Sequence, residues 1–294
     1  MAQTLESLTR HHGTLASIRG IVHAMKTLSA LNASPYEDAA CSIEAYHQTI
    51  MAGFRAFAHR SGDIVLAPDR RAGQLVVVFG SDHGLCGNYN ELLADAVMAW
   101  CKAPEADSCR VLCVGAQMND ALVDRGLPPE EVLLPPASAD GIGRLAGDVV
   151  TRLDSHSSGR WLGGHRVSLA FTERGDAGAL TPVTRQLLPL DPDLLRRERR
   201  WPSRSLPDYT MAPDELLAAL VRNHIFASVF RASAEAMVTE NAARLARMQQ
   251  AEEAVDDRLD ALKGELRSVR QTEITSELLD VIIGFEALKK RARR

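Results

Sequence analysis

The sequence is poor in aromatic side chains and has no long apolar run. Aromatic residues make up 5% of its 294 residues. Because aromatic side chains supply large buried areas in compact cores, their scarcity indicates a chain built largely of Ala- and Leu-rich helices. No run approaches the roughly 18 apolar residues that span a bilayer, and the first residues carry no signal-peptide pattern. The composition therefore predicts a cytoplasmic globular chain of one or two domains.

An excess of positive charge is also missing. Lys and Arg number 34 against 38 Asp and Glu, so the net charge is −4. Phosphate backbones are bound by clustered positive charge, and this balance therefore argues against a nucleic-acid-binding protein. The two basic clusters, at 196–204 and 289–294, are interpreted as solvated segments.

The sequence has only five cysteines, an odd number without regular spacing. No C-x-x-C pair and no neighbouring histidine pair accompanies them, so neither a zinc site nor another metal or cofactor site is expected. The simplest interpretation is free thiols in a reducing compartment. Cys109 and Cys113 lie in and beside an apolar run and are predicted to be buried in a strand.

Both ends of the chain have helical periodicity. Residues 3–58 carry one apolar stripe. Its members are Leu5, Leu8, Leu15, Ile18, Val22, Met25 and Leu28. Pro35 is expected to kink or restart this helix, with Ser34 as N-cap and Glu37 completing a capping box. Residues 213–288 form a second long helical pattern whose apolar positions alternate steps of three and four, as in a coiled coil. These positions are Met248, Ala251, Val255, Leu259, Leu262, Leu266 and Val269.

The middle of the chain alternates strand and helix patterns. Strands are expected at 74–79, 110–114, 131–134 and 166–172, and helices at 89–100, 117–125 and 141–154. Continuous apolar strands separated by helices favour a parallel sheet covered on both faces. Residues 173–212, which hold several prolines, are expected to be irregular. The predicted fold is an antiparallel coiled coil of the N-terminal (1–60) and C-terminal (211–294) helices, with a Rossmann-like α/β domain (70–210) inserted between them.

A glycine-rich turn follows the first expected strand. It reads Gly80, Ser81, Asp82, His83, Gly84, Leu85, Cys86 and Gly87. Such a turn before a helix can hold a phosphate, although it matches neither the G-x-G-x-x-G fingerprint nor a P-loop. The residues alone leave three hypotheses open: a nucleotide- or phosphate-binding enzyme using Ser81, Asp82 and His83, a free-standing coiled-coil scaffold, and a non-catalytic interaction protein.

Three segments together resemble the gamma subunits of rotary F-type ATP synthases. Residues 80–90 resemble the family motif G-S-D-(R/K)-G-L-C-G-x-(F/L/Y)-N, and residues 270–278 (RQTEITSEL) resemble its C-terminal R-Q-x-x-I-T-x-E-L signature. Residues 240–248 (ENAARLARM) are similar to the family's E-x-x-A-R-M-x-A-M stretch. Shorter similarities at 18–26 and 181–190 extend the resemblance over nearly the whole chain.

The resemblance implies a central rotor without a catalytic site or cofactor of its own. Its helical shaft would insert into a hexamer of alpha and beta subunits, and its globular part would sit on the membrane c-ring beside an epsilon subunit. The complex would couple ion flow to ATP synthesis or hydrolysis in the beta subunits, on the cytoplasmic face of a bacterial inner membrane. The turn at 80–87 would be a structural motif.

The resemblance also implies candidate partner contacts. They are Met25, Lys26, Glu240, Arg244, Gln271, Thr275 and Glu277. The chain departs from the family pattern at His83, where Arg or Lys is usual, and at Asn88, where Gly is usual. The basic run of the first family helix is also absent at 30–35. These departures resemble a divergent branch, such as the alternative sodium-type F-ATPase of some bacteria.

Overall fold

The computed structural model describes residues 5–61, 73–102, 109–157, 166–175, 178–192, 201, 204–205 and 207–292. The chain forms two compact units, and two long helices contribute to both. One unit comprises Met1–Leu28 and Leu245–Arg294, and the other comprises Ser29–Arg244. Most of the basic segment at 196–204, and the side chains of the basic tail, lie outside the described residues.

A five-stranded sheet forms the centre of the 29–244 unit. Its strands are β1 (Gln74–Phe79), β2 (Cys109–Val114), β3 (Glu131–Leu133), β4 (Arg166–Arg174) and β5 (Leu180–Leu188). They lie in the order β3-β2-β1-β4-β5. The predicted parallel pairing is confirmed for β1 to β4, whereas β5 runs antiparallel to β4. β5 lies in the segment that was expected to be irregular; its Pro182 is tolerated because β5 is an edge strand.

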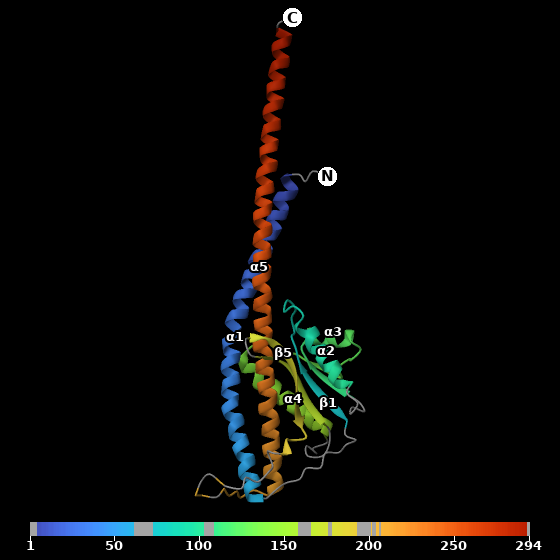
Figure 1. The fold of residues 1–294 in the computed structure, drawn as a ribbon, viewed down its shortest axis with the longest axis vertical. Helices are drawn as coiled ribbons and strands as arrows, with labels where there is room; N and C mark the ends of the chain where they lie inside the picture. Colours follow the sequence, from blue (N-terminus) through green and yellow to red (C-terminus); the bar gives the residue numbers. More distant parts are fainter. Residues whose placement is uncertain are drawn as a thin grey trace. The chain divides into compact units, whose positions relative to one another are not determined.

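Helices cover both faces of the sheet, as Figure 1 shows. One face carries α2 (Tyr89–Cys101) and α3 (Ala116–Asp124). The other carries α4 (Ile142–Ser157), which follows the short helix η1 (Ala139–Gly141), together with parts of α1 (Leu5–Ser61) and α5 (Pro213–Ala292). Side chains alternate accordingly along β1: Val76 and Val78 pack toward α2 and α3, while Val77 and Phe79 pack toward α1, α4 and α5.

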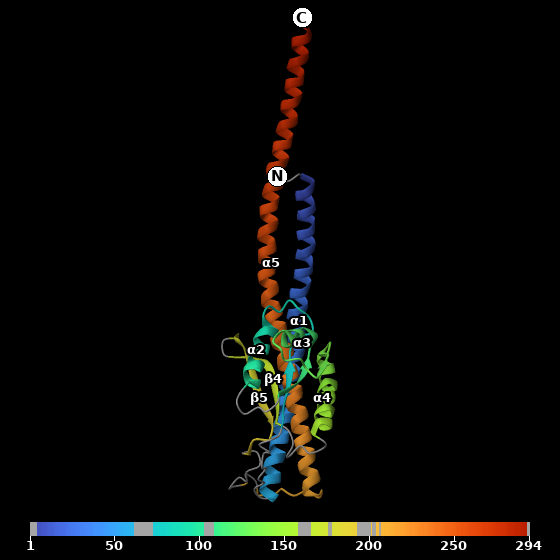
Figure 2. The same ribbon diagram turned by 90° about the vertical axis from the view of Figure 1, so that its right-hand side faces the viewer.

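In the other unit, the start of α1 pairs antiparallel with α5. Arg19 binds Asp256, and Lys26 binds Glu252 at 2.6 Å, so residue numbers rise along α1 as they fall along α5. Figure 2 shows the two helices side by side. The predicted heptad positions are the covered ones: Met248, Leu259 and Leu262 are buried and the other four are half-buried. After Val269 the described α5 side chains are all exposed.

α1 differs from the sequence-based expectation at two places. The helix continues through Pro35 without a restart. An internal proline costs about 3 kcal/mol. Here the adjacent Tyr36, 3% exposed, packs with Ile142 and Val238, so tertiary burial offsets that cost. Two members of the apolar stripe, Ile18 and Leu28, are 39% and 57% exposed. Among the described residues, no helical stretch combines the length and apolarity that crossing a membrane requires.

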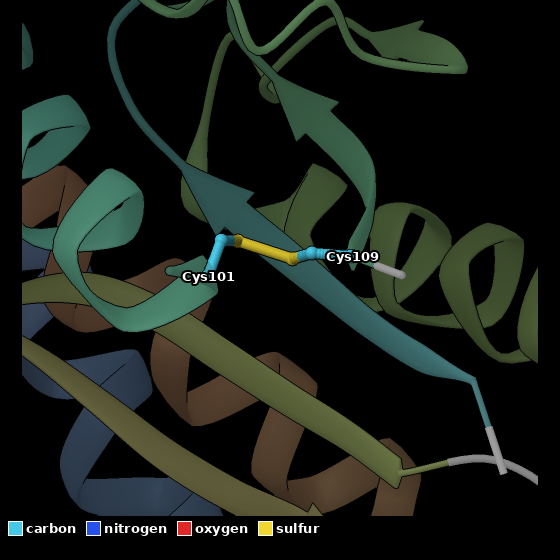
Figure 3. Close-up of a disulfide and its surroundings, with 2 residues drawn as sticks. All are labelled: Cys101 and Cys109. Carbon is cyan, nitrogen blue, oxygen red and sulfur yellow. A yellow bond between two sulfur atoms is a disulfide. The ribbon is translucent and has the colours of Figure 1, made fainter. Parts of the chain in front are cut away.

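The cysteines differ from the expectation of free thiols. Cys101, at the end of α2, and Cys109, at the start of β2, form a disulfide with their Cα atoms 5.6 Å apart (Figure 3). The sequence places them eight residues apart without a recognisable motif, and only the return of the chain into β2 brings them together. Cys41, Cys86 and Cys113 are free, and Cys113 is buried in β2 as expected.

Candidate functional site

The glycine-rich turn, here called the Gly80 turn (residues 80–87), joins β1 to α2 and is held from inside. The Ser81 side chain is fully buried. Its backbone N–H donates to Asn90 Oδ1 at 3.0 Å, and Asn90 Nδ2 donates to Ser81 Oγ at 2.7 Å. Because Asn90 lies in the first turn of α2, these two bonds lock the turn onto the helix that follows it. Cys86 Sγ lies 3.5 Å from Ser81 Oγ, and burial raises the pKa of this thiol.

Asp82 occupies the N-terminus of a second helix. Its Oδ1 accepts a hydrogen bond from the backbone N–H of Ala116, the first residue of α3, at 3.2 Å. Helix N-termini favour negative charge because their first N–H groups have no partner within the helix. The carboxylate of the turn therefore takes a position that a phosphate would occupy in a nucleotide-binding fold.

The shaft helix α5 holds the outer part of the Gly80 turn. Arg244 donates from Nη2 to the carbonyl of His83 at 3.3 Å and from Nε to that of Gly84 at 3.4 Å. It also donates to Glu240 Oε1 at 2.5 Å, one helical turn earlier. The Arg244 and Glu240 side chains are only 11% and 7% exposed. Burial raises the pKa of Glu240, and Arg244 partly opposes that rise.

A buried hydroxyl network connects the same helix to the sheet. Tyr89 Oη donates to the carbonyl of Ala236 at 3.1 Å and lies 3.1 Å from Thr239 Oγ1. Thr239 Oγ1 also lies 3.1 Å from the carbonyl of Thr172 in β4. In doubly wound sheets, ligands bind where the strand order reverses, which here is the carboxyl edge of β1 and β4. At that edge, the side chains of α5 fill the position of a ligand.

These contacts bear on the hypothesis of a catalytic Ser81, Asp82 and His83. Ser81 Oγ bonds with Asn90 and Cys86, and Asp82 caps α3. The His83 side chain is 82% exposed, and its Nδ1 lies 3.4 Å from Asp82. A nucleophile needs a base within hydrogen-bonding reach, and among the described residues the side-chain partners of Ser81 are Asn90 and Cys86, not His83. The arrangement is that of a braced structural turn.

Leu85 is an exposed apolar residue of the Gly80 turn. Its φ of 68° lies in the left-handed region, where a non-glycine residue is strained, and its side chain is 57% exposed. Such strained residues persist only where their surroundings fix the backbone. The bonds from Arg244 to the two preceding carbonyls supply that constraint.

The other candidate contact residues lie in the unit of 1–28 and 245–294. Lys26 is half-buried and paired with Glu252, and Met25 is half-buried beside it. Gln271, Thr275 and Glu277 are exposed, and Thr275 Oγ1 donates to the carbonyl of Gln271 at 2.8 Å. Their roles as partner contacts stay predictions.

Sequence reasoning missed the internal role of several residues. Asn90 and Tyr89 were noted only as part of a motif, and Thr239 was not singled out. An asparagine shortly after a glycine-rich segment, such as Asn90, is only a weak sequence signal for a side chain that is buried and holds the turn. Asn90 bonds to the backbone N–H and the hydroxyl of Ser81, and Arg244 bonds to backbone carbonyls 160 residues away. Periodicity identifies neither set of partners.

The comparisons with known proteins agree with this fold. The model of the ATP synthase family matches residues 4–288. The ATP synthase gamma chain of Chlorobium phaeobacteroides is 26% identical over 298 residues, which cover 97% of this chain and 99% of that one. The gamma chain of Nitratidesulfovibrio vulgaris is 30% identical over 218 residues, 73% of each chain.

Solved structures show the same architecture. The rotor of the Euglena gracilis mitochondrial ATP synthase aligns with a TM-score of 0.61 at 13% identity, covering 92% of this chain and 98% of that one. The central stalk of the Tetrahymena thermophila mitochondrial enzyme aligns with a TM-score of 0.52 at 19% identity, covering 79% and 99%. Family model, relatives and fold point the same way: the chain belongs to the ATP synthase family, among its gamma chains.

Proposed function

We propose that this chain is the central rotor subunit of an F-type ATP synthase, coupling ion flow through a membrane sector to ATP synthesis or hydrolysis in the beta subunits. Membership among the gamma chains supports this role. The structural observation that carries the proposal is the apolar end of α5. A helix that is apolar on most of its circumference is stable in water only when another protein surface covers it.

The apolar end of α5 spans residues 274–285. Seven large apolar side chains lie in it, each between 52% and 71% exposed. They are Ile274, Leu278, Leu279, Val281, Ile282, Ile283 and Phe285. Ile274, Leu278, Ile282 and Phe285 follow each other at steps of four and three and so share one face. Exposed apolar side chains over more than half of the circumference of a single helix fit insertion into a close-fitting sleeve, such as the hexamer of alpha and beta subunits.

We assign the polar contacts of this sleeve to exposed residues next to the apolar end. Gln271 and Thr275 lie on the face that Ile274 and Leu278 extend, and Glu277 lies beside it. Met25 and Lys26 are assigned to contacts of α1 with a beta subunit. Glu240 and Arg244, which are turned inward, act on a partner through the Gly80 turn that they hold.

The remaining partners follow from the same role. The globular part would rest on the membrane c-ring beside an epsilon subunit, and the chain would belong to the catalytic sector that lies peripheral to the membrane. In a bacterium, that sector faces the cytoplasm at the inner membrane. The side chains that we assign carry no catalytic step, because ATP is made and hydrolysed in the beta subunits.

Purification of the tagged chain from gently solubilised membranes tests the proposal. We expect one copy with three alpha and three beta subunits. A triple variant, Ile274→Ser, Leu278→Ser and Ile282→Ser, should lose that recovery and coupled ATP synthesis. The control is Val123→Ser with Val132→Ser, at apolar side chains that are 50% and 41% exposed elsewhere. Recovery of the chain alone, or full coupling in the triple variant, would overturn the proposal.

A further inference from the structure

Two half-buried histidines, one on each of the two long helices, face each other in the 29–244 unit. His47 of α1 and His224 of α5 have ring centroids 5.5 Å apart, inclined at 35°. The Nδ1 atom of each ring is buried and has no hydrogen-bond partner among the residues that the structure describes. Phe54 packs its ring against His224 at 5.9 Å in an edge-on arrangement. The two imidazoles therefore lie in a largely apolar contact that favours their neutral forms.

The charged groups around the pair act in both directions, and the rings still favour their neutral forms. Glu44, one turn before His47 on α1, binds Arg231 of α5 at 3.2 Å and accepts a hydrogen bond from Gln48. Burial lowers the pKa of His47 most strongly, Arg231 lowers it further, and Glu44 opposes both without reversing the shift. Among the described residues, the charge that acts on His224 is that of His47 itself. Protonating one ring therefore makes protonation of the other still less favourable.

We propose that the His47–His224 pair is an acid-sensitive latch between α1 and α5. In its neutral form it packs the two helices together beside the sheet. In acid, two positive rings at this distance, with Arg231 next to them, repel each other and are driven toward water. The two rings lie on different helices, α1 and α5. Local separation of these helices therefore relieves the repulsion between the rings. This inference concerns the internal packing of the chain and stands apart from the proposed rotor function.

The pH range of the latch follows from its titration. Burial lowers the pKa of His224 to about 4 and lowers that of His47 below its usual value. In the opened form both rings regain a pKa of about 6.5. The opened form therefore binds more protons as the pH falls below about 6.5, and the closed form loses stability from there down to about pH 4.

Hydrogen exchange on the full-length chain, followed by mass spectrometry from pH 7.5 to 4.5, tests the latch. After correction for intrinsic rates, we expect the opening equilibrium in peptides around His47 and His224 to rise on the order of tenfold or more. Peptides from α2 report on the rest of the fold and should change less. Equal opening in α2 peptides would show general acid unfolding and would overturn the proposal.

Variants at the two rings identify the cause. His224→Leu, and His47→Leu with it, should remove the local acid response, whereas His11→Leu, at an exposed histidine, should retain it. Should the leucine variants fail to fold, NMR titration of the histidine ring protons in the wild-type chain decides without substitution. One imidazole titrating well below pH 5.5 supports the latch. Ordinary titration of all nine histidines, or an unchanged response in the leucine variants, would overturn it.

Discussion

The carboxylate of Asp82, in the turn after β1, accepts a hydrogen bond from the backbone N–H of Ala116 at the start of α3. In nucleotide-binding α/β folds, a phosphate takes such a position at a helix N-terminus. Here a side chain of the protein takes it, and residues of α5 fill the neighbouring carboxyl edge of β1 and β4. The glycine-rich turn thus resembles a ligand-binding loop in its position after β1. Its backbone carbonyls bond to Arg244 and so attach the turn to α5.

The Arg244–Glu240 pair should be strongly coupled. Arg244→Met leaves a buried carboxylate without its cation, and we expect a loss of about 3–5 kcal/mol in the free energy of unfolding. Replacing both residues, with Glu240→Leu added, should recover much of that loss, because no buried charge remains. Urea unfolding of the wild type, both single variants and the double variant measures the coupling. Additive losses would contradict it.

The cost of Arg244→Met should also depend on pH. Burial already raises the pKa of Glu240, and removing the guanidinium raises it further. A carboxyl group with a raised pKa in the folded state contributes stability below its unfolded value, and this contribution is lost as the pH rises through the folded value. The variant should therefore be closer to the wild type at pH 5 than at pH 8. A deficit that does not change with pH would mean that Glu240 is not the group left unpaired.

Asn90 should contribute strongly to the stability of the fold, because its amide pairs with two buried groups of Ser81. Asn90→Ala removes the acceptor of the Ser81 N–H and the donor to Ser81 Oγ, both buried. An unsatisfied buried polar group costs about 1–3 kcal/mol. Asn119→Ala is the control, because that amide bonds to the side chain of the adjacent Asp120 at the surface. Thermal unfolding of both variants should show a clear drop in the melting temperature for Asn90→Ala alone.

Gly115, in the link between β2 and α3, should not tolerate a side chain. Its φ is +110°, and a Cβ there would lie 2.5 Å from the carbonyl oxygen of Ser81, a backbone atom that cannot give way cheaply. Gly115→Ala is expected to lower stability by several times the roughly 1 kcal/mol cost of backbone strain alone. Gly126→Ala isolates that strain, since its φ is +74° with nothing within 4 Å. Equal stability of the two variants would refute the predicted clash.

Leu85→Gly should stabilise the isolated chain and weaken the binding of any partner protein that contacts the Gly80 turn. A left-handed backbone costs a non-glycine residue about 1–2 kcal/mol, and glycine removes this cost. Part of the gain is cancelled, because glycine also makes the unfolded state more flexible and so more favourable. Leu92→Gly, at an exposed site within α2, should instead destabilise by about 1 kcal/mol. Denaturant midpoints of both variants give the comparison, and a loss of stability in Leu85→Gly would show that the Leu85 side chain packs within the fold.

Local patterns in the sequence determined most of the architecture. The heptad positions from Met248 to Val269, the four parallel strands of the sheet and the helices between them were predictable, because burial imposes a period on neighbouring residues. The Gly80 turn and the family to which the chain belongs could be recognised in the same way. These features depend on residues that are close together in the sequence.

Only the tertiary structure decided what depends on distant partners. It showed that α1 continues through Pro35, where packing of Tyr36 offsets the missing hydrogen bond. It placed a proline-containing strand at the edge of the sheet and joined Cys101 to Cys109. It also paired Arg244 with the carbonyls of a turn 160 residues away. Burial and the choice of partner at these sites depend on contacts between segments that are distant in the sequence. Such contacts leave no repeating pattern of residues along the chain.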